Sequence, residues 1–487
     1  MIERKRGKYV ICIYSFLLFI FHLIRCFDNN FWGDETYSIR LAKMTVPGLI
    51  SETASDVHPP LYYIILKLFS SLLGFRGSVF HAVSLLAYAA VIIIAVTVIF
   101  DRIGRFAAFF LVTCASFVPN AVHFNVEVRM YSFGALFVLL SFLFLRNILC
   151  KDEPRDYVFF VVFSLAAAYT HYYCLISVAF FYVVLLILAL LYPKKILKKV
   201  LVACIATVVL YLPWFVVLLN TFRRTTDEFW MAWTPYLSDC LSFFYSGRFG
   251  LLLFFVFIVI SVCYILHDAL NQKKDRDNTD IGDLTVKLFR WEISGDGIWF
   301  MAGLFSILGT VAVGMLVSKF IRPVLIVRYL YPVSVITWLL AGVGISCFKS
   351  KFRTVLSVVL SALLLCSSLP ESYELIKSDT ENNELFMKTV SQVNGRIGAD
   401  DIILTDLMVI DWTLGDYYFP DVKIVMVSPD DFPAFESGKE YWLIINPDHL
   451  SDYEGVINSD GICCEQIVHR GSLGTVGADI YLLMQDR

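Results

Sequence analysis

Acidic residues and an imidazole are clustered in the segment between the first two apolar runs of the chain. Asp34 and Glu35 are adjacent in FWGDETYSIRLA, and Asp56 and His58 occur in the run DVHPP. Adjacent carboxylates repel each other, so a cation or solvent must offset their charge. These residue types indicate a site for a divalent cation or a polar ligand, and an ordinary solvated loop is the alternative.

Arginines in later segments suit a different ligand. Glu127, Arg129 and Tyr131 lie at the junction of two apolar runs, and Arg322 and Arg328 occur in IRPVLIVRYLYP. A charge beside hydrocarbon is costly unless it is paired, so Glu127 and Arg129 are expected to pair together or to bind an anion. Guanidinium groups bind phosphate through paired hydrogen bonds. Anchoring at the membrane interface is the alternative for each arginine.

Aromatic residues accompany these charges. The short run THYYC contains His171 and Tyr172, and Trp230 lies in NTFRRTTDEFWMAW. An aromatic belt at a membrane surface explains the tyrosine. It does not explain His171, which is therefore a candidate site residue.

The composition shows what must position these residues. The 487 residues are 58% hydrophobic and 17% charged, and the mean hydropathy is +0.69. A soluble protein of this length is less apolar and more charged. The net charge of -3 and the short basic clusters offer no surface for nucleic acid. We therefore expect a polytopic α-helical membrane protein.

Eleven apolar runs are long enough to be membrane spans. They cover residues 9–27, 78–100, 106–124, 131–149, 157–171, 173–192, 200–219, 249–267, 298–318, 329–347 and 354–369.

The distribution of Lys and Arg predicts the orientation. Alternate loops, with the N-terminus, carry 21 of these residues, against 12 in the opposite set. Cytoplasmic loops retain positive charge. We therefore expect a multi-pass protein of the plasma or inner membrane with a cytoplasmic N-terminus. One long span over 157–192 would reverse everything after it, but the alternation of basic loops argues against that.

Two parts of the chain are not simple spans. Residues 28–77 are expected to form an outer loop that carries the acidic site, with an amphipathic helix at 58–74 lying in the interface. Strand-like runs at 401–406, 422–427 and 441–446 are separated by Asp, Pro and Gly. We expect a transmembrane domain over 1–375 and a small extracytoplasmic α/β domain over 376–487.

The order of the motifs resembles a known superfamily. The chain contains DE, DxHPPLYY at 56–63, ExRMYS at 127–132, THYY at 170–173, FW at 229–230 and RYLYP at 328–332. This series is similar to the bacterial branch of the GT-C membrane glycosyltransferases, which includes protein mannosyltransferases and aminoarabinose transferases. The resemblance covers about residues 9–370, and no single motif is specific.

The resemblance implies transfer of a hexose or pentose from a polyprenyl-phosphate donor to a lipid, glycan or protein of the cell envelope. Asp34 would be the catalytic base of an inverting reaction, with Glu35 beside it. Asp56 and His58 would position the acceptor, or Glu35 and His58 would bind a divalent cation, with no other cofactor implied. Arg129 and Arg328 would hold the carrier phosphate. The supporting residues would be Glu127, Tyr131, His171, Tyr172, Trp230 and Arg322.

Two other functions remain open. A transporter or flippase of a lipid-linked saccharide would place ionisable residues near the bilayer midplane, whereas the apolar runs here are almost free of charge. A noncatalytic membrane scaffold would bind partners through the tail and would tolerate the loss of Asp34 and Arg129.

Overall fold

The structure is a computed structural model. It describes residues 2–28, 30–224, 234–272, 286–288, 291–393, 395–408, 410, 415–419, 421–436, 439–459, 461–473 and 476–485. The chain divides into two compact units. Unit 1 comprises Met1–Cys26, Val46–Ile65 and His81–Tyr373, and unit 2 comprises Phe27–Thr45, Leu66–Phe80 and Glu374–Arg487.

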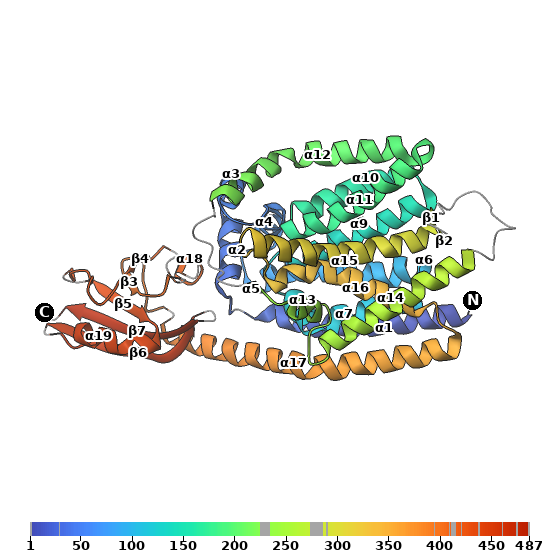
Figure 1. Cartoon of the computed structure of the whole chain (residues 1–487). Helices are drawn as coiled ribbons and strands as arrows, with labels where there is room; N and C mark the ends of the chain where they lie inside the picture. The colour runs from blue at the N-terminus through green and yellow to red at the C-terminus, as the bar shows by residue number, and fades with distance from the viewer. Residues whose placement is uncertain are drawn as a thin grey trace. The chain divides into compact units, whose positions relative to one another are not determined.

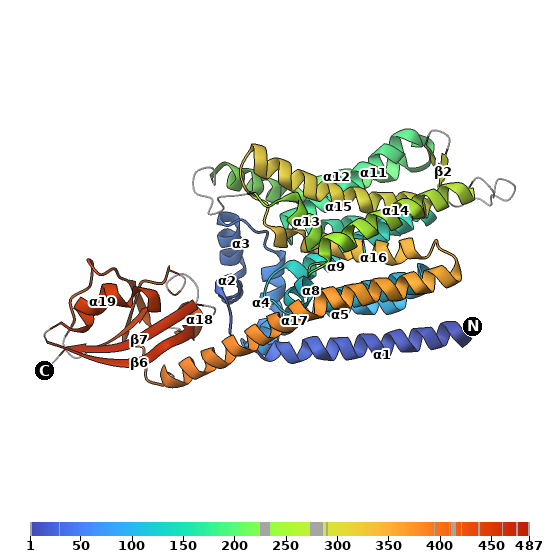
Figure 2. The same ribbon diagram turned by 60° about the horizontal axis from the view of Figure 1, so that its bottom comes forward.

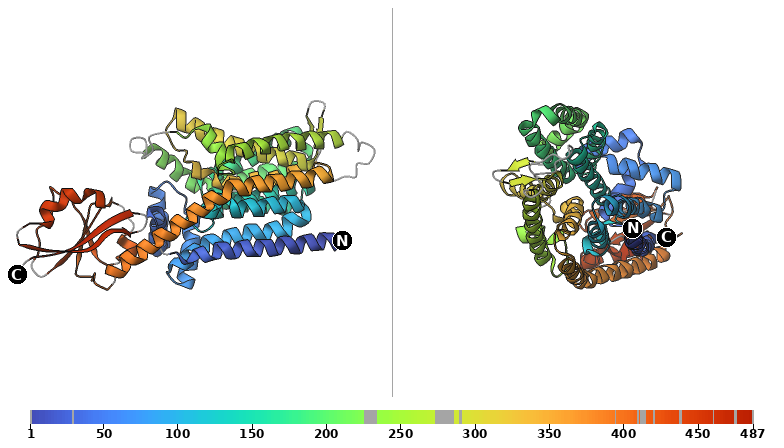
Figure 3. Two further views of the ribbon diagram at one scale, coloured as in Figure 1. Left: turned by 90° about the horizontal axis from the view of Figure 1, so that it is seen from below. Right: turned by 90° about the vertical axis from the view of Figure 1, so that its right-hand side faces the viewer.

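Unit 1 is a helical bundle whose long helices run in nearly a common direction (Figures 1 and 2). Figure 3 shows these helices nearly end-on in its right-hand view. The first half contains α1 (Ile2–Ile24), α3 (Val46–Ser55), α5 (Gly77–Ile94), the π-helical turn η2 (Ala95–Ile99), α6 (Phe100–Arg102), α7 (Arg105–Phe117), α8 (Pro119–Phe124), α9 (Tyr131–Lys151) and α10 (Pro154–Ala168). The second half contains α11 (Tyr172–Leu191), α12 (Pro193–Arg224), α13 (Leu237–Phe243), α14 (Gly250–Gln272), α15 (Gly295–Phe320), η3 (Val327–Leu330), α16 (Tyr331–Ile345) and the part of α17 (Ser350–Val393) up to Tyr373.

The prediction of a polytopic membrane protein is confirmed. Within the described residues, nine helices are long and apolar enough to cross a membrane. Two further predicted spans correspond to the shorter helices α7 and α10. The break at Tyr169–His171 separates α10 from α11, so the run 157–192 is two helices and not one.

Burial is greatest at the centre of the bundle. Every residue of α16 is buried, and α16 packs against α7, α9, α14 and α15. The outward side of α12 instead exposes large apolar residues such as Val202, Ile205 and Val208. Continuous apolar exposure of this kind suits a lipid environment, whereas in water it would drive aggregation.

Described residues of the predicted basic loops meet at one end of unit 1. Ion pairs connect the beginnings and ends of helices that are distant in the sequence: Lys8 with Asp101, Arg146 with Asp296, and Lys199 with Asp152. The helices therefore alternate in direction as the loop pattern predicted. That this end faces the cytoplasm remains a prediction.

The segment 28–77 contains more helix than the sequence indicated. The expected helix at 58–74 is present as α4 (Leu61–Leu73), but α2 (Gly33–Lys43) and α3 precede it. In α2 the acids Asp34 and Glu35 lie in the first turn, and Arg40 and Lys43 lie in the last turn. This arrangement complements the helix dipole, so the charges that made the segment look like a loop favour a helix.

Unit 2 contains a mixed five-stranded sheet. The strands are β3 (Ile402–Thr405), β4 (Lys423–Met426), β5 (Glu440–Ile445), β6 (Ile462–Leu473) and β7 (Val476–Gln485), in the order β4-β3-β5-β7-β6. β3 pairs in parallel with β4 and β5, whereas β7 pairs antiparallel with β5 and β6. The three predicted strands are confirmed, and the β6–β7 hairpin is additional.

Both faces of this sheet are covered, which explains its apolar strands. In β5, Tyr441 and Leu443 pack in a cluster with Tyr453 of α19 (Leu450–Ile457), which Figure 2 shows beside the sheet. Trp442 and Ile444 face the other way and pack with Phe386 near the end of α17. Unit 2 is therefore a small α/β layer structure, as predicted.

Candidate active site

The start of α4 brings His58 beside His171. The two prolines after His58 precede α4, and the Leu61 amide donates to the Tyr169 carbonyl at 3.0 Å. This bond ties the DVHPP segment to the turn between α10 and α11. The His58 and His171 ring centroids lie 5.9 Å apart, and both side chains are buried.

His171 is held in one tautomer. It is the N-cap of α11, and its Nδ1 accepts the Tyr173 amide hydrogen at 3.1 Å. Burial lowers the pKa of His171 well below its ordinary value, and the charges of His58, Arg129 and Arg328 act in the same direction. The ring is therefore neutral at pH 7 and carries its hydrogen on Nε2, which makes Nε2 a donor.

Asp56 is stabilised in its ionised form by its neighbour. Its Oδ2 lies 3.3 Å from His58 Nδ1. Burial raises the pKa of the Asp56 carboxyl, but the hydrogen bond and charge of His58, the Val57 backbone amide and the charge of Arg129 all lower this pKa and together outweigh burial. The net result is a pKa below the ordinary value. The sequence prediction that Asp56 and His58 act at one place is consistent with this geometry.

The segment between α8 and α9 positions Glu127 and Arg129. All its residues are buried, and Asn125 Nδ2 donates to the Ala115 carbonyl at 2.8 Å. His81 Nδ1 lies 2.7 Å from the Val126 carbonyl oxygen. The Arg129 guanidinium donates to Tyr63 Oη at 3.3 Å and is only 2% exposed. A buried arginine on a fixed backbone is a pre-positioned anion ligand.

Arg328 and Tyr329 enter from η3, the turn before α16. The Tyr329 ring lies 4.8 Å from that of His171, and the Tyr131 ring lies 6.0 Å from His171. Tyr131, at the start of α9, lies within electrostatic range of Arg328, Arg129 and Glu127. Three separate segments thus contribute to one cluster of positive and aromatic groups.

A cavity of about 390 Å³ opens beside this cluster. Its polar lining includes His58, His171, Tyr172, Arg322 and Tyr329. Its remaining walls are largely apolar and come from α11, α12 and α15: Leu175, Ile176, Leu218, Leu219, Val313 and Val317. The cavity therefore has an apolar part and a polar end, which suits an amphiphile with an anionic head.

Asp34 and Glu35 belong to unit 2. Both lie in the first turn of α2, and Glu35 Oε2 accepts the Trp32 amide hydrogen at 3.3 Å. Burial raises the pKa of Tyr417 to about 12, and Glu35 adds to this effect. Glu35 is 5% exposed, whereas Asp34 is partly exposed. Glu35 thus has a structural role in beginning α2.

The predicted residues separate into three groups. Unit 1 brings together Asp56, His58, Glu127, Arg129, Tyr131, His171, Tyr172, Arg322 and Arg328. Asp34 and Glu35 lie in unit 2, and Trp230 lies outside the described residues. Sequence reasoning missed Tyr63, Tyr173 and Tyr329 as site residues. All three lie in quoted motifs, but an aromatic belt explains the tyrosines of THYY, and Tyr63 and Tyr329 carry no predicted role of their own.

The arrangement offers few ligands for a metal ion. Among the described residues, no group of three or more His, Cys, Asp or Glu side chains is placed to hold one. Near the cavity, Asp56 and His58 are joined by their own hydrogen bond. The predicted divalent cation stays a prediction.

Comparisons with known proteins agree on the architecture. Residues 57–220 match the family model described as dolichyl-phosphate-mannose-protein mannosyltransferase. The crystal structure of ArnT from Cupriavidus metallidurans in the apo state is similar with a TM-score of 0.61, at 12% identity over 97% of each chain. The same protein bound to undecaprenyl phosphate gives 0.59, again at 12% identity and 97% coverage of each chain. Among curated protein sequences, none matches the chain significantly.

The fold and the matched segment confirm the resemblance that the motifs indicated: the chain has the fold of ArnT, and its residues 57–220 are similar to the mannosyltransferase family.

Proposed function

We propose that this chain is a membrane glycosyltransferase that moves a sugar from a polyprenyl-phosphate donor to an extracytoplasmic acceptor. One observation carries the proposal: an apolar cavity ends at a cluster that contains His58, His171, Arg322 and Tyr329, with Arg129 and Arg328 close by. The undecaprenyl phosphate bound by the structurally similar ArnT has the same division into an apolar chain and an anionic head.

The cluster suits the leaving group of such a reaction. The acceptor oxygen attacks the anomeric carbon, the bond from that carbon to the phosphate oxygen breaks, and the polyprenyl phosphate leaves with the bonding electrons. Negative charge therefore grows on the phosphate. Arg129 and Arg328 would stabilise that charge, and the Nε2 hydrogen of neutral His171 would donate to it.

A carboxylate must accept the proton that the acceptor loses. We propose Asp34 for this role, from its match to the first acidic residue of the family pattern. Asp56 is the competing candidate, because it is ionised and lies beside the cavity-lining His58. A lowered pKa makes a carboxylate a poorer proton acceptor, so we assign Asp56 and His58 to holding the acceptor.

The experiment is transfer from synthetic polyprenyl-phosphate sugars by the purified full chain, with products identified by mass spectrometry. Asp34→Asn and Asp56→Asn are compared at saturating donor, with and without a chelator. The proposal predicts that Asp34→Asn abolishes turnover, whereas Asp56→Asn mainly raises the KM for the acceptor. The chelator arm decides whether a divalent cation takes part.

Each contrary result has a meaning. Full turnover by Asp34→Asn with loss in Asp56→Asn would reassign the base to Asp56. Movement of the donor across vesicles without sugar transfer would replace the enzyme proposal by the flippase alternative. If a wild-type protein that melts cooperatively neither transfers nor moves any donor of the panel, the proposed function is wrong.

A further inference from the structure

A second cavity, of about 280 Å³, lies at the other end of α9 from Tyr131. α9 has 21 residues, so its two ends are about 30 Å apart. This cavity is lined by residues from η2, the end of α6, the last turns of α9 and the start of α10. It belongs to the end of unit 1 where the basic loops meet, and the proposed transfer reaction does not use it.

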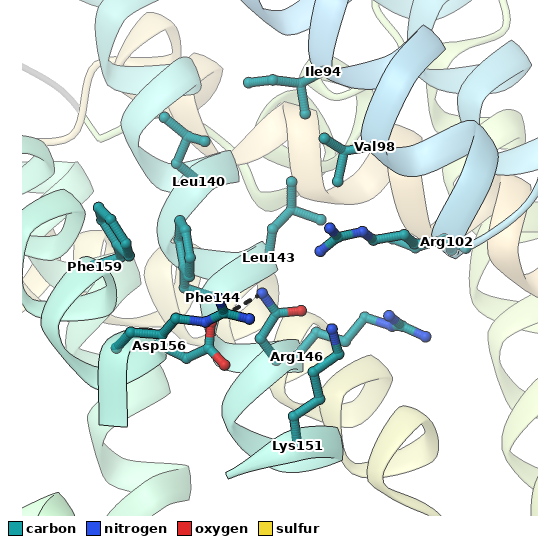
Figure 4. A pocket seen from close by; sticks show the side chains of 13 residues that line it. Ile94, Val98, Arg102, Leu140, Leu143, Phe144, Arg146, Lys151, Asp156 and Phe159 are labelled. Carbon is teal, nitrogen blue, oxygen red and sulfur yellow. Dashed lines mark hydrogen bonds between the residues drawn. The ribbon is translucent and has the colours of Figure 1, made fainter. Parts of the chain in front are cut away.

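The charged lining of this cavity is mainly positive. Four cations line it, and two of them are paired: Arg146 with Asp296 at 2.7 Å and Arg155 with Glu153 at 2.6 Å. Arg102 and Lys151 make no hydrogen bond or ion pair within the part of the chain that the structure describes. Figure 4 shows their side chains extending toward the same space from two helices. An anion bound there would contact two cations that do not have to give up another hydrogen bond or ion pair.

The rest of the lining is apolar and faces the helix surface. Phe144 and Phe159 stack with centroids 5.0 Å apart, and Phe159 is 46% exposed. Ile94, Val98, Leu140 and Leu143 complete this side. A soluble phosphate makes no favourable contact with this apolar surface, whereas the first methylene groups of a lipid's acyl chains can pack against it.

A buried carboxylate makes the site more selective. Asp156 is 3% exposed, and Asn147 Nδ2 donates to its Oδ1 at 3.3 Å (Figure 4). Its Oδ2 is buried and accepts no hydrogen bond from the described residues. A buried acceptor without a donor is costly, and a hydroxyl group on the ligand would satisfy it. Arg102 and Lys151 can hold a phosphate while Asp156 accepts from a hydroxyl of the same headgroup.

A π-helical turn lies in the backbone beside this cavity. The turn η2, which contributes Val98, is π-helical, and such turns interrupt a helix at a cost in regular hydrogen bonding. They occur frequently at functional sites. Here the interruption lies one turn before Arg102.

We propose that this cavity binds the headgroup of an anionic phospholipid that carries hydroxyl groups, of the phosphatidylglycerol type. The phosphate diester lies between Arg102 and Lys151, a headgroup hydroxyl donates to Asp156, and the acyl chains follow the apolar side of Phe144 and Phe159. The bound lipid joins the α6, α9 and α10 ends.

The test is native mass spectrometry of the purified full chain with added phosphatidylglycerol, phosphatidic acid or phosphatidylcholine of the same acyl chains. The double variant Arg102→Gln/Lys151→Gln should lose phosphatidylglycerol binding by about tenfold or more. The matched control Lys349→Gln/Lys351→Gln removes two exposed cations at the start of α17 and should change binding less than about twofold.

A second variant tests the hydroxyl contact. Asp156→Asn keeps an oxygen for Asn147 and replaces the other acceptor by a donor. Phosphatidic acid lacks the headgroup hydroxyls, so the preference for phosphatidylglycerol over it should disappear in this variant. The proposal fails if phosphatidylcholine binds as well as phosphatidylglycerol, if both double variants lose binding equally, or if soluble glycerophosphate displaces the lipid.

Discussion

At the scale of single residues, the account depends most on Arg129. Its guanidinium is buried, and its backbone is fixed by contacts of Asn125 and His81 with neighbouring segments. Removing such a cation should leave the fold but weaken stabilisation of the leaving phosphate. We predict that Arg129→Gln lowers kcat/KM by at least about 100-fold. The control is Arg105→Gln, an exposed arginine at the start of α7, which should keep wild-type kinetics.

The pair Asp56–His58 gives a pH-dependent prediction. The folded pKa of Asp56 lies below its unfolded value, chiefly because His58 offsets the effect of burial. The pair therefore stabilises the fold above about pH 4, and this contribution is lost as pH falls through the folded pKa. We predict that His58→Gln costs about 1–2 kcal/mol at pH 7 and less near pH 3.

Thermal melting of the detergent-solubilised protein over a pH series measures this difference. A gap between wild type and His58→Gln that stays constant from pH 3 to 7 would show that His58 acts through packing and not through charge.

At the scale of elements, Gly314 of α15 lines the cavity of about 390 Å³ beside Tyr173. A Cβ at this position would lie 3.0 Å from Tyr173 Cε1 and 3.2 Å from Leu325 Cδ1. A larger side chain must therefore displace Tyr173 or fill the cavity. We predict that Gly314→Val destabilises the protein by about 1–3 kcal/mol and raises the KM for the polyprenyl donor more than it lowers kcat. An unchanged donor KM in a destabilised variant would place the isoprenoid chain elsewhere.

The elements that the sequence predicted well are the helices that correspond to long apolar runs. Each of the eleven apolar runs is helical, because a chain in hydrocarbon must satisfy its backbone hydrogen bonds internally. α2 was missed because its charges resemble those of a loop. β6 was missed because its exposed face gives the polar run ICCEQIVHRGSL, which lacks a strong strand pattern.

The site residues that the sequence predicted are ionisable side chains next to apolar runs, where a charge is costly unless it has a function or a partner. Arg129, Arg328 and His171 stood out from their apolar surroundings, and the structure brings them together. Tyr329 did not, since tyrosine beside a membrane has a simpler explanation. The DVHPP segment meets the α10–α11 turn through the Leu61–Tyr169 backbone bond and the His58–His171 ring contact, and spacing in the sequence does not reveal such long-range contacts.

At the scale of the whole molecule, the orientation is testable by labelling. Cys463 in β6 is exposed, and Lys151 is exposed at the end of α9. In a variant whose other cysteines are replaced, a membrane-impermeant maleimide should label Cys463 in intact cells. Lys151→Cys in a cysteine-free variant should react only after permeabilisation. The reverse pattern would invert the topology, and with it the side on which transfer takes place.

The most direct test of the central claim is one reaction in which both products are measured. Wild-type protein in vesicles is given a polyprenyl-phosphate sugar and an acceptor panel, and free polyprenyl phosphate and glycosylated acceptor are quantified together. The account predicts equal amounts of the two products, lost in Arg129→Gln and kept in Arg105→Gln. Equal activity in wild type and Arg129→Gln, or release of polyprenyl phosphate without a glycosylated acceptor, would contradict it.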